Sequence, residues 1–301
     1  MSNRQENYAT YNYCVSFIDL LGQREALHGQ GLLPVLNTDA DREAFLTIIR
    51  ESIGAIIRLQ RDAETMVKRV IEPDPNSPFR STLSDEERVT WDAMQFTRLT
   101  TQRWSDGLVS FVSLGDRDIK CLMNGIYSIF CLSGTLCFLG LTRGKPVRGA
   151  IDVAWGMELH VGELYGPAVV RAYELESEVA QYPRIVVSSR TIQFLQACSR
   201  NTDTDPFSRF NRALADLCLK MLIPDADGSW TLHYLGESFR WSVTQDNHVV
   251  LYNEAYAFVM AQLRKHQDSG NSKLAFRYSH LMGYFYEHPP PTEEQSSSRP
   301  R

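Results

Sequence analysis

The first 190 residues alternate between short β-rich apolar runs and longer segments with helical periodicity. Residues 13–19 (YCVSFID) predict a buried strand, and residues 41–68 carry apolar side chains at the spacing of an amphipathic helix. The segments that follow predict strands at 96–104 and 108–114, a helix at 119–141, a hairpin of 146–154 and 158–164 around residues 155–157, a helix at 167–180 and a strand at 183–188. This order is that of the ferredoxin-like (βαββαβ) pattern, so we expect an α+β fold.

The remaining residues predict helices and one short hairpin. The helices are expected at 191–198, 210–221, 249–266 and 272–287, and the hairpin near 232–243. Residues 289–301 are rich in proline and serine, a composition typical of disorder. We therefore expect a core at 1–190, an extension at 191–288 packed on that core, and a disordered tail.

The composition limits which kinds of partner the chain is expected to bind and in which cellular compartment it is expected. The chain has 31 basic and 36 acidic residues and a net charge of −5, which argues against binding of a nucleic-acid duplex because such binding needs a basic face. The six cysteines form no CxxC pair and lie mostly in apolar runs, as expected of reduced cysteines in the cytoplasm. The first residues contain no apolar signal region, and no run of 18 apolar residues predicts membrane insertion.

Two aspartates stand where strands of the predicted sheet end. Asp19 closes the first strand, and Asp106 lies in the turn between the second and third. These strands are neighbours in a βαββαβ sheet, so the two carboxylates are expected at one edge. Paired carboxylates repel unless a cation bridges them, and oxygen ligands favour Mg²⁺ or Mn²⁺. The amides of Leu20, Leu21 and Gly22 are placed to cradle phosphate. The alternative, that each aspartate is structural, stays open here.

Several motifs resemble those of class III nucleotidyl cyclases over residues 11–190. Residues 17–22 (FIDLLG) resemble the first metal motif of that family, F-x-D-x-x-G, and residues 104–107 (WSDG) resemble the hairpin with its second metal aspartate. Residues 165–176 (YGPAVVRAYELE) are similar to the family's G-x-x-V-N-x-A-A-R-L-E helix, and residues 183–188 (PRIVVS) to the strand after it.

The chain departs from that family at the positions that stabilise the transition state and read the base, not at the metal aspartates. Val170 stands at the position of the family's transition-state asparagine and Glu174 at that of its arginine. Gln102 and Glu163 replace the lysine and aspartate that read adenine. With its metal half retained, the chain resembles the pyrimidine cyclases of the bacterial Pycsar antiphage systems, which make cyclic UMP or cyclic CMP.

This resemblance implies a uridylate cyclase that converts UTP to 3′,5′-cyclic UMP and pyrophosphate. Two Mn²⁺ or Mg²⁺ ions would be held by the carboxylates of Asp19 and Asp106 and by Leu20. Gln102 and Glu163 would meet the mixed donor and acceptor edge of uracil. Arg103 and Arg171, with Arg24, would offset phosphate charge, and Arg171 would partly replace the missing family arginine.

The resemblance also implies partners. Class III cyclases build each site across a homodimer interface, and Pycsar cyclases act with an effector that senses the cyclic nucleotide, plausibly a membrane protein. Two alternatives remain. Cytosine can also donate from its amino group to Glu163, so a cytidylate cyclase is one. The other is a degenerate, nucleotide-sensing homologue, favoured by Val170 and Glu174.

Overall fold

The computed structural model describes residues 9–22, 36–51, 53–71, 78–94, 97–104, 107–115 and 119–290. Asp106, Arg24 and most of the predicted tail (residues 291–301) lie outside the described residues. The described chain combines helices with one mixed sheet, which confirms the mixed helix and strand class.

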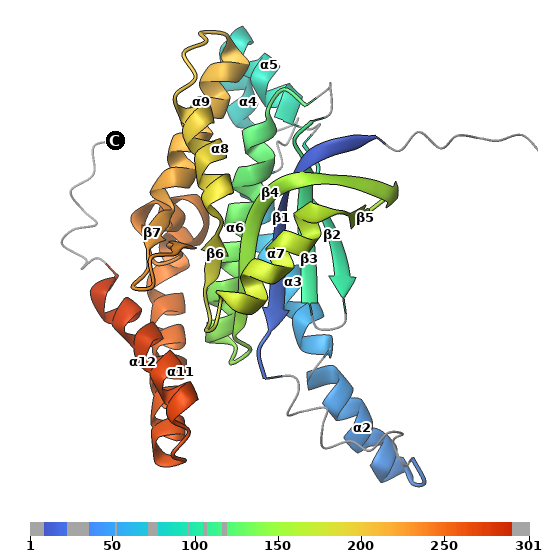
Figure 1. Cartoon of the computed structure of the whole chain (residues 1–301), viewed down its shortest axis with the longest axis vertical. Coiled ribbons are helices and arrows are strands. Elements are labelled where there is room, and N and C mark those ends of the chain that lie inside the picture. Colours follow the sequence, from blue (N-terminus) through green and yellow to red (C-terminus); the bar gives the residue numbers. More distant parts are fainter. Residues whose placement is uncertain are drawn as a thin grey trace, which may run out of the picture.

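Eight described strands form a single sheet (Figure 1). Their order along the sheet is β2-β3-β1-β4-β6-β8-β7, and β5 pairs with β4 alone. All neighbours run antiparallel except β4 and β6. The strands are β1 (Thr10–Leu20), β2 (Thr100–Trp104), β3 (Gly107–Ser113), β4 (Val147–His160), β5 (Glu163–Tyr165), β6 (Ile185–Val187), β7 (Leu222–Pro224) and β8 (Trp230–Leu232).

Helices cover both faces of the sheet around β1. The face of Cys14 and Ile18 packs against α3 (Ile53–Ile71) and α6 (Leu122–Thr142), whereas the face of Val15 and Phe17 packs against α7 (Pro167–Glu178). Successive strand residues point to opposite faces. The apolar run at 13–18 is therefore buried on both sides.

Helix α6 is the central core helix. Apart from its first and last residues, every position is buried, and its Ser133 hydroxyl pairs with that of Ser16 on β1 at 2.7 Å. By length and composition it is the one described helix that could cross a membrane, but 94% of its most apolar window is buried inside the protein. This is consistent with the core helix of a soluble protein.

The other helices precede β2 or follow β6. Helices α2 (Asp39–Glu51), α4 (Pro78–Thr82) and α5 (Asp85–Ala93) lie before β2. After β6 come α8 (Ser189–Ser199), α9 (Pro206–Lys220), the short α10 (Glu237–Phe239) with its π- and 3₁₀-helical continuation to Asn247, α11 (His248–Asp268) and α12 (Ser272–Glu287).

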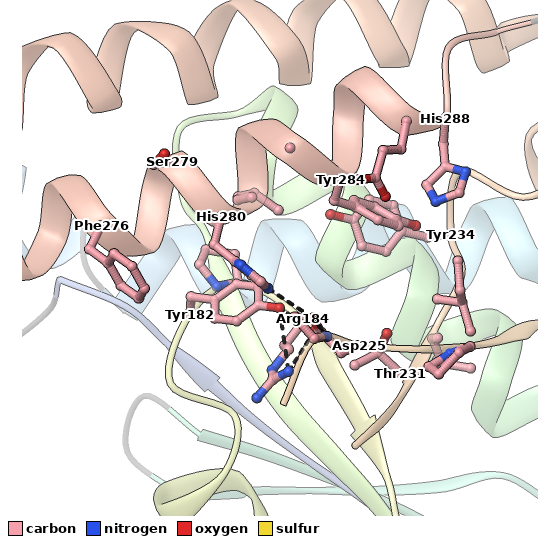
Figure 2. A pocket seen from close by; sticks show the side chains of 18 residues that line it. Tyr182, Arg184, Asp225, Thr231, Tyr234, Phe276, Ser279, His280, Tyr284 and His288 are labelled. Carbon is pink, nitrogen blue, oxygen red and sulfur yellow. Dashed lines mark hydrogen bonds and ion pairs between the residues drawn. The ribbon is translucent and has the colours of Figure 1, made fainter. Parts of the chain in front are cut away.

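Two connections tie the C-terminal helices to the sheet. Strand β8 pairs with β6, so the sheet continues across residue 190. Arg184, just before β6, donates to Asp225 at 2.5 Å and to Asp227 at 2.6 Å, and His280 on α12 lies 2.8 Å from the other oxygen of Asp225. Figure 2 shows Tyr182, Arg184 and His280 converging on Asp225 beside a cavity of about 360 Å³.

The segment predicted as a helix at 41–68 is helical in α2 and α3, and residue 52 between them lies outside the described residues. Two other sequence predictions are wrong in detail. The expected turn at residues 155–157 is instead the middle of β4, because Trp155 and Gly156 still pair with Asn12 and Tyr11 of β1. The C-terminal hairpin is made by β7 and β8 rather than by residues 232–243, which are mostly helical.

Candidate functional site

The carboxyl end of β1 brings Asp19 to an edge of the sheet. Asp19 opposes Gly107 of β3 on one side and Arg148 of β4 on the other. Its side chain is 28% exposed, in contrast to the buried residues before it. Asp106 lies outside the described residues, but its chain neighbour Gly107 is the residue opposite Asp19. The pairing thus places the first residue of β3 beside Asp19.

Arg148 neutralises charge at this edge. One of its terminal nitrogens lies 3.7 Å from the Asp19 carboxylate, and its Nε forms an ion pair with Glu176 of α7. The Glu176 side chain is 2% exposed, so it needs a cationic partner. Arg148 therefore joins the end of β1 to α7.

The donor chemistry of this edge fits a divalent cation. Asp19 offers carboxylate oxygens, which Mg²⁺ and Mn²⁺ prefer, and Asp106 would add a second carboxylate. Within the described ranges, no group of three or more His, Cys, Asp or Glu residues is arranged to hold a metal. The ligand set of Asp19, Leu20 and Asp106 stays a prediction.

The segment after Asp19 is only partly available for phosphate. The Leu21 amide donates to the carbonyl of Pro146 at 2.9 Å, so in this structure it does not cradle an anion. Leu20 is buried and pairs with Val147. Gly22 adopts a left-handed φ of +87° and a Cβ there would meet open space. Of the three predicted amides, Leu21 is thus already engaged.

Arg171 lies on α7 but is committed to a buried carboxylate. Its Nε donates to Asp152 of β4 at 2.9 Å, and the other oxygen of Asp152 accepts from the Val153 amide and the Ser188 hydroxyl. Asp152 is 2% exposed, and a buried carboxylate is stable only when paired. The structure gives Arg171 a positioning role, and its predicted contact with phosphate stays a prediction.

Gln102 shares the sheet face of Asp19, whereas Arg103 does not. Gln102 pairs with Val109, which packs on the α7 side, and its Oε1 is buried without a hydrogen-bond partner among the described residues. Arg103 points to the α3 side, where its Nε donates to Gln60 at 2.9 Å. The structure does not bring Arg103 to Asp19.

The β4–β5 hairpin carries Glu163 toward the strand of Gln102. Gly162 at its tip has a φ of +83°, and a Cβ there would lie 3.6 Å from Thr100 of β2. Glu163 accepts a hydrogen bond from Tyr165 at 3.3 Å. The two predicted base-reading residues therefore stand on neighbouring elements.

Helix α7 exposes the positions at which the chain departs from the cyclase motif. Val170 and Glu174 are exposed, and Val170 keeps 53% of its surface. Tyr173 is half exposed and packs edge-on against Phe17, with ring centroids 5.3 Å apart.

Sequence reasoning did not identify Asp152, Arg148 and Glu176 as members of these networks. A lone carboxylate inside an apolar strand, as in residues 147–154 (VRGAIDVA), was the available signal for Asp152. A buried acid in such a run requires a cation from elsewhere in the chain.

Neither the scan against protein-family models nor the search of curated proteins finds a match to this chain.

Proposed function

We propose that the chain is a uridylate cyclase with a ferredoxin-like core, acting as a cytoplasmic homodimer. The observation that carries the proposal is the pairing of Asp19 with Gly107, the residue that directly follows the second motif aspartate, Asp106. The strand order β2-β3-β1-β4 supports it, because this antiparallel order is the one a βαββαβ core has.

The reaction would join the ribose 3′-oxygen to the α-phosphorus of UTP. The bond between the α-phosphorus and the bridging oxygen breaks, pyrophosphate leaves, and the hydroxyl proton passes to water. Divalent cations supply charge neutralisation and activation of the hydroxyl in such transfers. In this chain Asp19 would hold them, Arg148 would keep the carboxylate oriented, and Gln102 and Glu163 would contact the base.

A cytidylate cyclase is the nearest alternative. The Gln102 amide offers both donor and acceptor, and the Glu163 carboxylate accepts from either uracil N3–H or the cytosine amino group. The Tyr165 hydroxyl that contacts Glu163 leaves its other oxygen able to accept. The product formed in a competition between UTP and CTP separates the two.

A nucleotide-sensing homologue without turnover is favoured by one observation. Arg171, the proposed replacement for the family arginine, is already paired with Asp152. If Arg171 cannot reach phosphate, the chemical step loses a cation.

By the same resemblance, the enzyme and the sensor would each act with a downstream effector of phage defence that binds the nucleotide.

The test is a product assay on the full chain with each of the four nucleoside triphosphates and Mn²⁺. We expect cyclic UMP, and we expect Asp19→Asn and Asp106→Asn each to lower its rate by about 10³-fold or more, because a metal-held phosphate depends on both carboxylates. Asp203→Asn, an exposed aspartate in the loop before α9, is the matched control and should keep full activity.

Melting curves of the variants separate chemistry from folding. Asp19 is partly exposed, so its isosteric amide should leave the melting temperature close to that of the wild type. Absence of any cyclic nucleotide with all four substrates would remove the enzyme proposal and leave the sensor.

A further inference from the structure

A cleft of about 720 Å³ opens beside the carboxyl end of β1. It is lined by the end of β1, the turn between α6 and β4, the segment between α7 and β6, and residues of α2, α11 and α12. The two last helices lie outside the 190 residues that resemble a cyclase. The cleft is within the size range of small-molecule sites.

The charge of this cleft is opposite to that of the chain. Lys145, Lys265 and Arg277 line it, and Glu51 is the one carboxylate among the described residues of the lining. Within the part of the chain that the structure describes, none of these three cations has an ion pair. A chain of net charge −5 thus collects unneutralised positive charge at one place.

Arg148 links the cleft to the candidate site through its charge. One of its terminal nitrogens lies 3.7 Å from the Asp19 carboxylate. Burial and then the charge of Arg148 lower the pKa of the Arg277 guanidinium, which lines the cleft. Like charges repel, so an anion bound in the cleft would offset the repulsion between these two guanidiniums.

Phosphate bound near the end of β1 would depend on cationic side chains more than on the Leu21 amide. Because Leu21 donates to Pro146, phosphate oxygens near the end of β1 must find other donors. Lys145 directly precedes Pro146, and Lys265 of α11 and Arg277 of α12 line the same cleft. The cleft therefore offers donors from both the core and the C-terminal helices.

We infer that this cleft binds polyphosphate, holding the triphosphate tail of the nucleotide through Lys145 from the core and Lys265 and Arg277 from the C-terminal helices. The inference rests on the proposed function for its substrate, but not for the binding itself. It assigns the α11–α12 pair a role in the site: it closes the cleft over the phosphates and is not merely an appendage.

The experiment measures inorganic tripolyphosphate binding to the full chain by calorimetry. Arg277→Gln and Lys265→Gln should each raise the dissociation constant about tenfold, the loss expected for a charge-assisted contact. Lys273→Gln on α12 and Arg264→Gln on α11 are matched controls, because both are exposed and neither lines the cleft. Both should bind as the wild type does.

Several outcomes would overturn the inference. These are no tripolyphosphate binding by the wild type, equal losses in the controls, or orthophosphate binding as tightly as tripolyphosphate. The product assay keeps the two proposals apart. Cyclic UMP formation with a Michaelis constant unchanged by Arg277→Gln would remove the cleft and leave the enzyme. Tripolyphosphate binding lost in Arg277→Gln, with no cyclic product from any nucleotide, would remove the enzyme and leave the cleft.

Discussion

Two arginines, Arg148 on β4 and Arg184 just before the neighbouring strand β6, stand in different electrostatic surroundings. Arg184 is 6% exposed and donates to Asp225, Asp227 and a backbone carbonyl, with the Tyr182 ring 4.5 Å away. Arg148 is 21% exposed and has one buried carboxylate, Glu176, with Asp19 at a longer distance.

The difference indicates what each region is for. The network of Arg184 is closed in the sense that its one guanidinium and two carboxylates bond to one another within the fold. Hydrogen bonds, chiefly from Arg184, lower the pKa of Asp227. For Asp225, burial raises the pKa, but hydrogen bonds from Tyr182, His280 and Arg184 together lower it below its usual value. Arg148, in contrast, has one close carboxylate, and its charge also acts on Arg277 in the lining of the cleft proposed to bind polyphosphate.

The largest expected effect on stability comes from opening the closed network. Arg184→Leu leaves two carboxylates without their shared cation, and we expect a loss of about 3–5 kcal/mol in the free energy of unfolding. Arg148→Leu should cost less, because it leaves one buried carboxylate, Glu176, without its cation rather than two, and Asp19 remains accessible to water. Urea titrations measure both. Equal losses would mean that the two arginines are electrostatically equivalent.

Acid should destabilise the C-terminal half of the chain through two histidines, His233 and His248. Burial above all lowers the pKa of His233 and of His248 from 6.5 to about 4. The unfolded chain therefore binds more protons than the folded one between these values, and stability is lost as the pH falls from about 6.5 to about 4.

The expected loss is on the order of 3 kcal/mol for each histidine, and it appears as a falling unfolding free energy in urea titrations at stepped pH. His248→Gln should flatten this dependence, since it removes one of the two groups. An unfolding free energy that stays constant from pH 7 to pH 4.5 would contradict the burial of neutral histidines.

The smallest effect is expected where both partners face water. Arg143 and Asp62 form an ion pair between the end of α6 and α3, with exposures of 45% and 41%. Solvent screens such a pair, so Arg143→Gln should change the unfolding free energy by no more than about 0.5 kcal/mol. A loss comparable to that of Arg184→Leu would show that burial does not set the contrast between the arginines.

Local sequence patterns correctly predicted the elements that consist of continuous apolar runs. The apolar run at 13–18 and the apolar segment of α6 led to the correct element types. The path of β4 did not follow from its sequence, because Gly156 suggests a turn, whereas pairing with Tyr11, nearly 150 residues earlier, keeps it extended. The C-terminal hairpin was misplaced for the same reason, since β8 depends on β6.

The residues of the candidate site also fall into those that local sequence predicts and those that it does not. Asp19 was predictable from its place after a buried run. The commitment of Arg171 to Asp152 and of Arg103 to Gln60 was not, because each pair joins separate elements of the fold. Likewise, Arg277 reaches the cleft only through the packing of α12, and no local motif marks it.

The two borders of the sheet bear on how copies of the chain can associate. On one side the sheet ends in β7, three residues long and closed by Pro224, which has no amide hydrogen to donate. A short border strand with a proline resists the addition of another chain. The other border is β2, next to the hairpin tip at Gly162. Pairing between copies through strands is therefore disfavoured at the β7 border, so the proposed homodimer would have to form through another surface, such as the side of β2 and the β4–β5 hairpin.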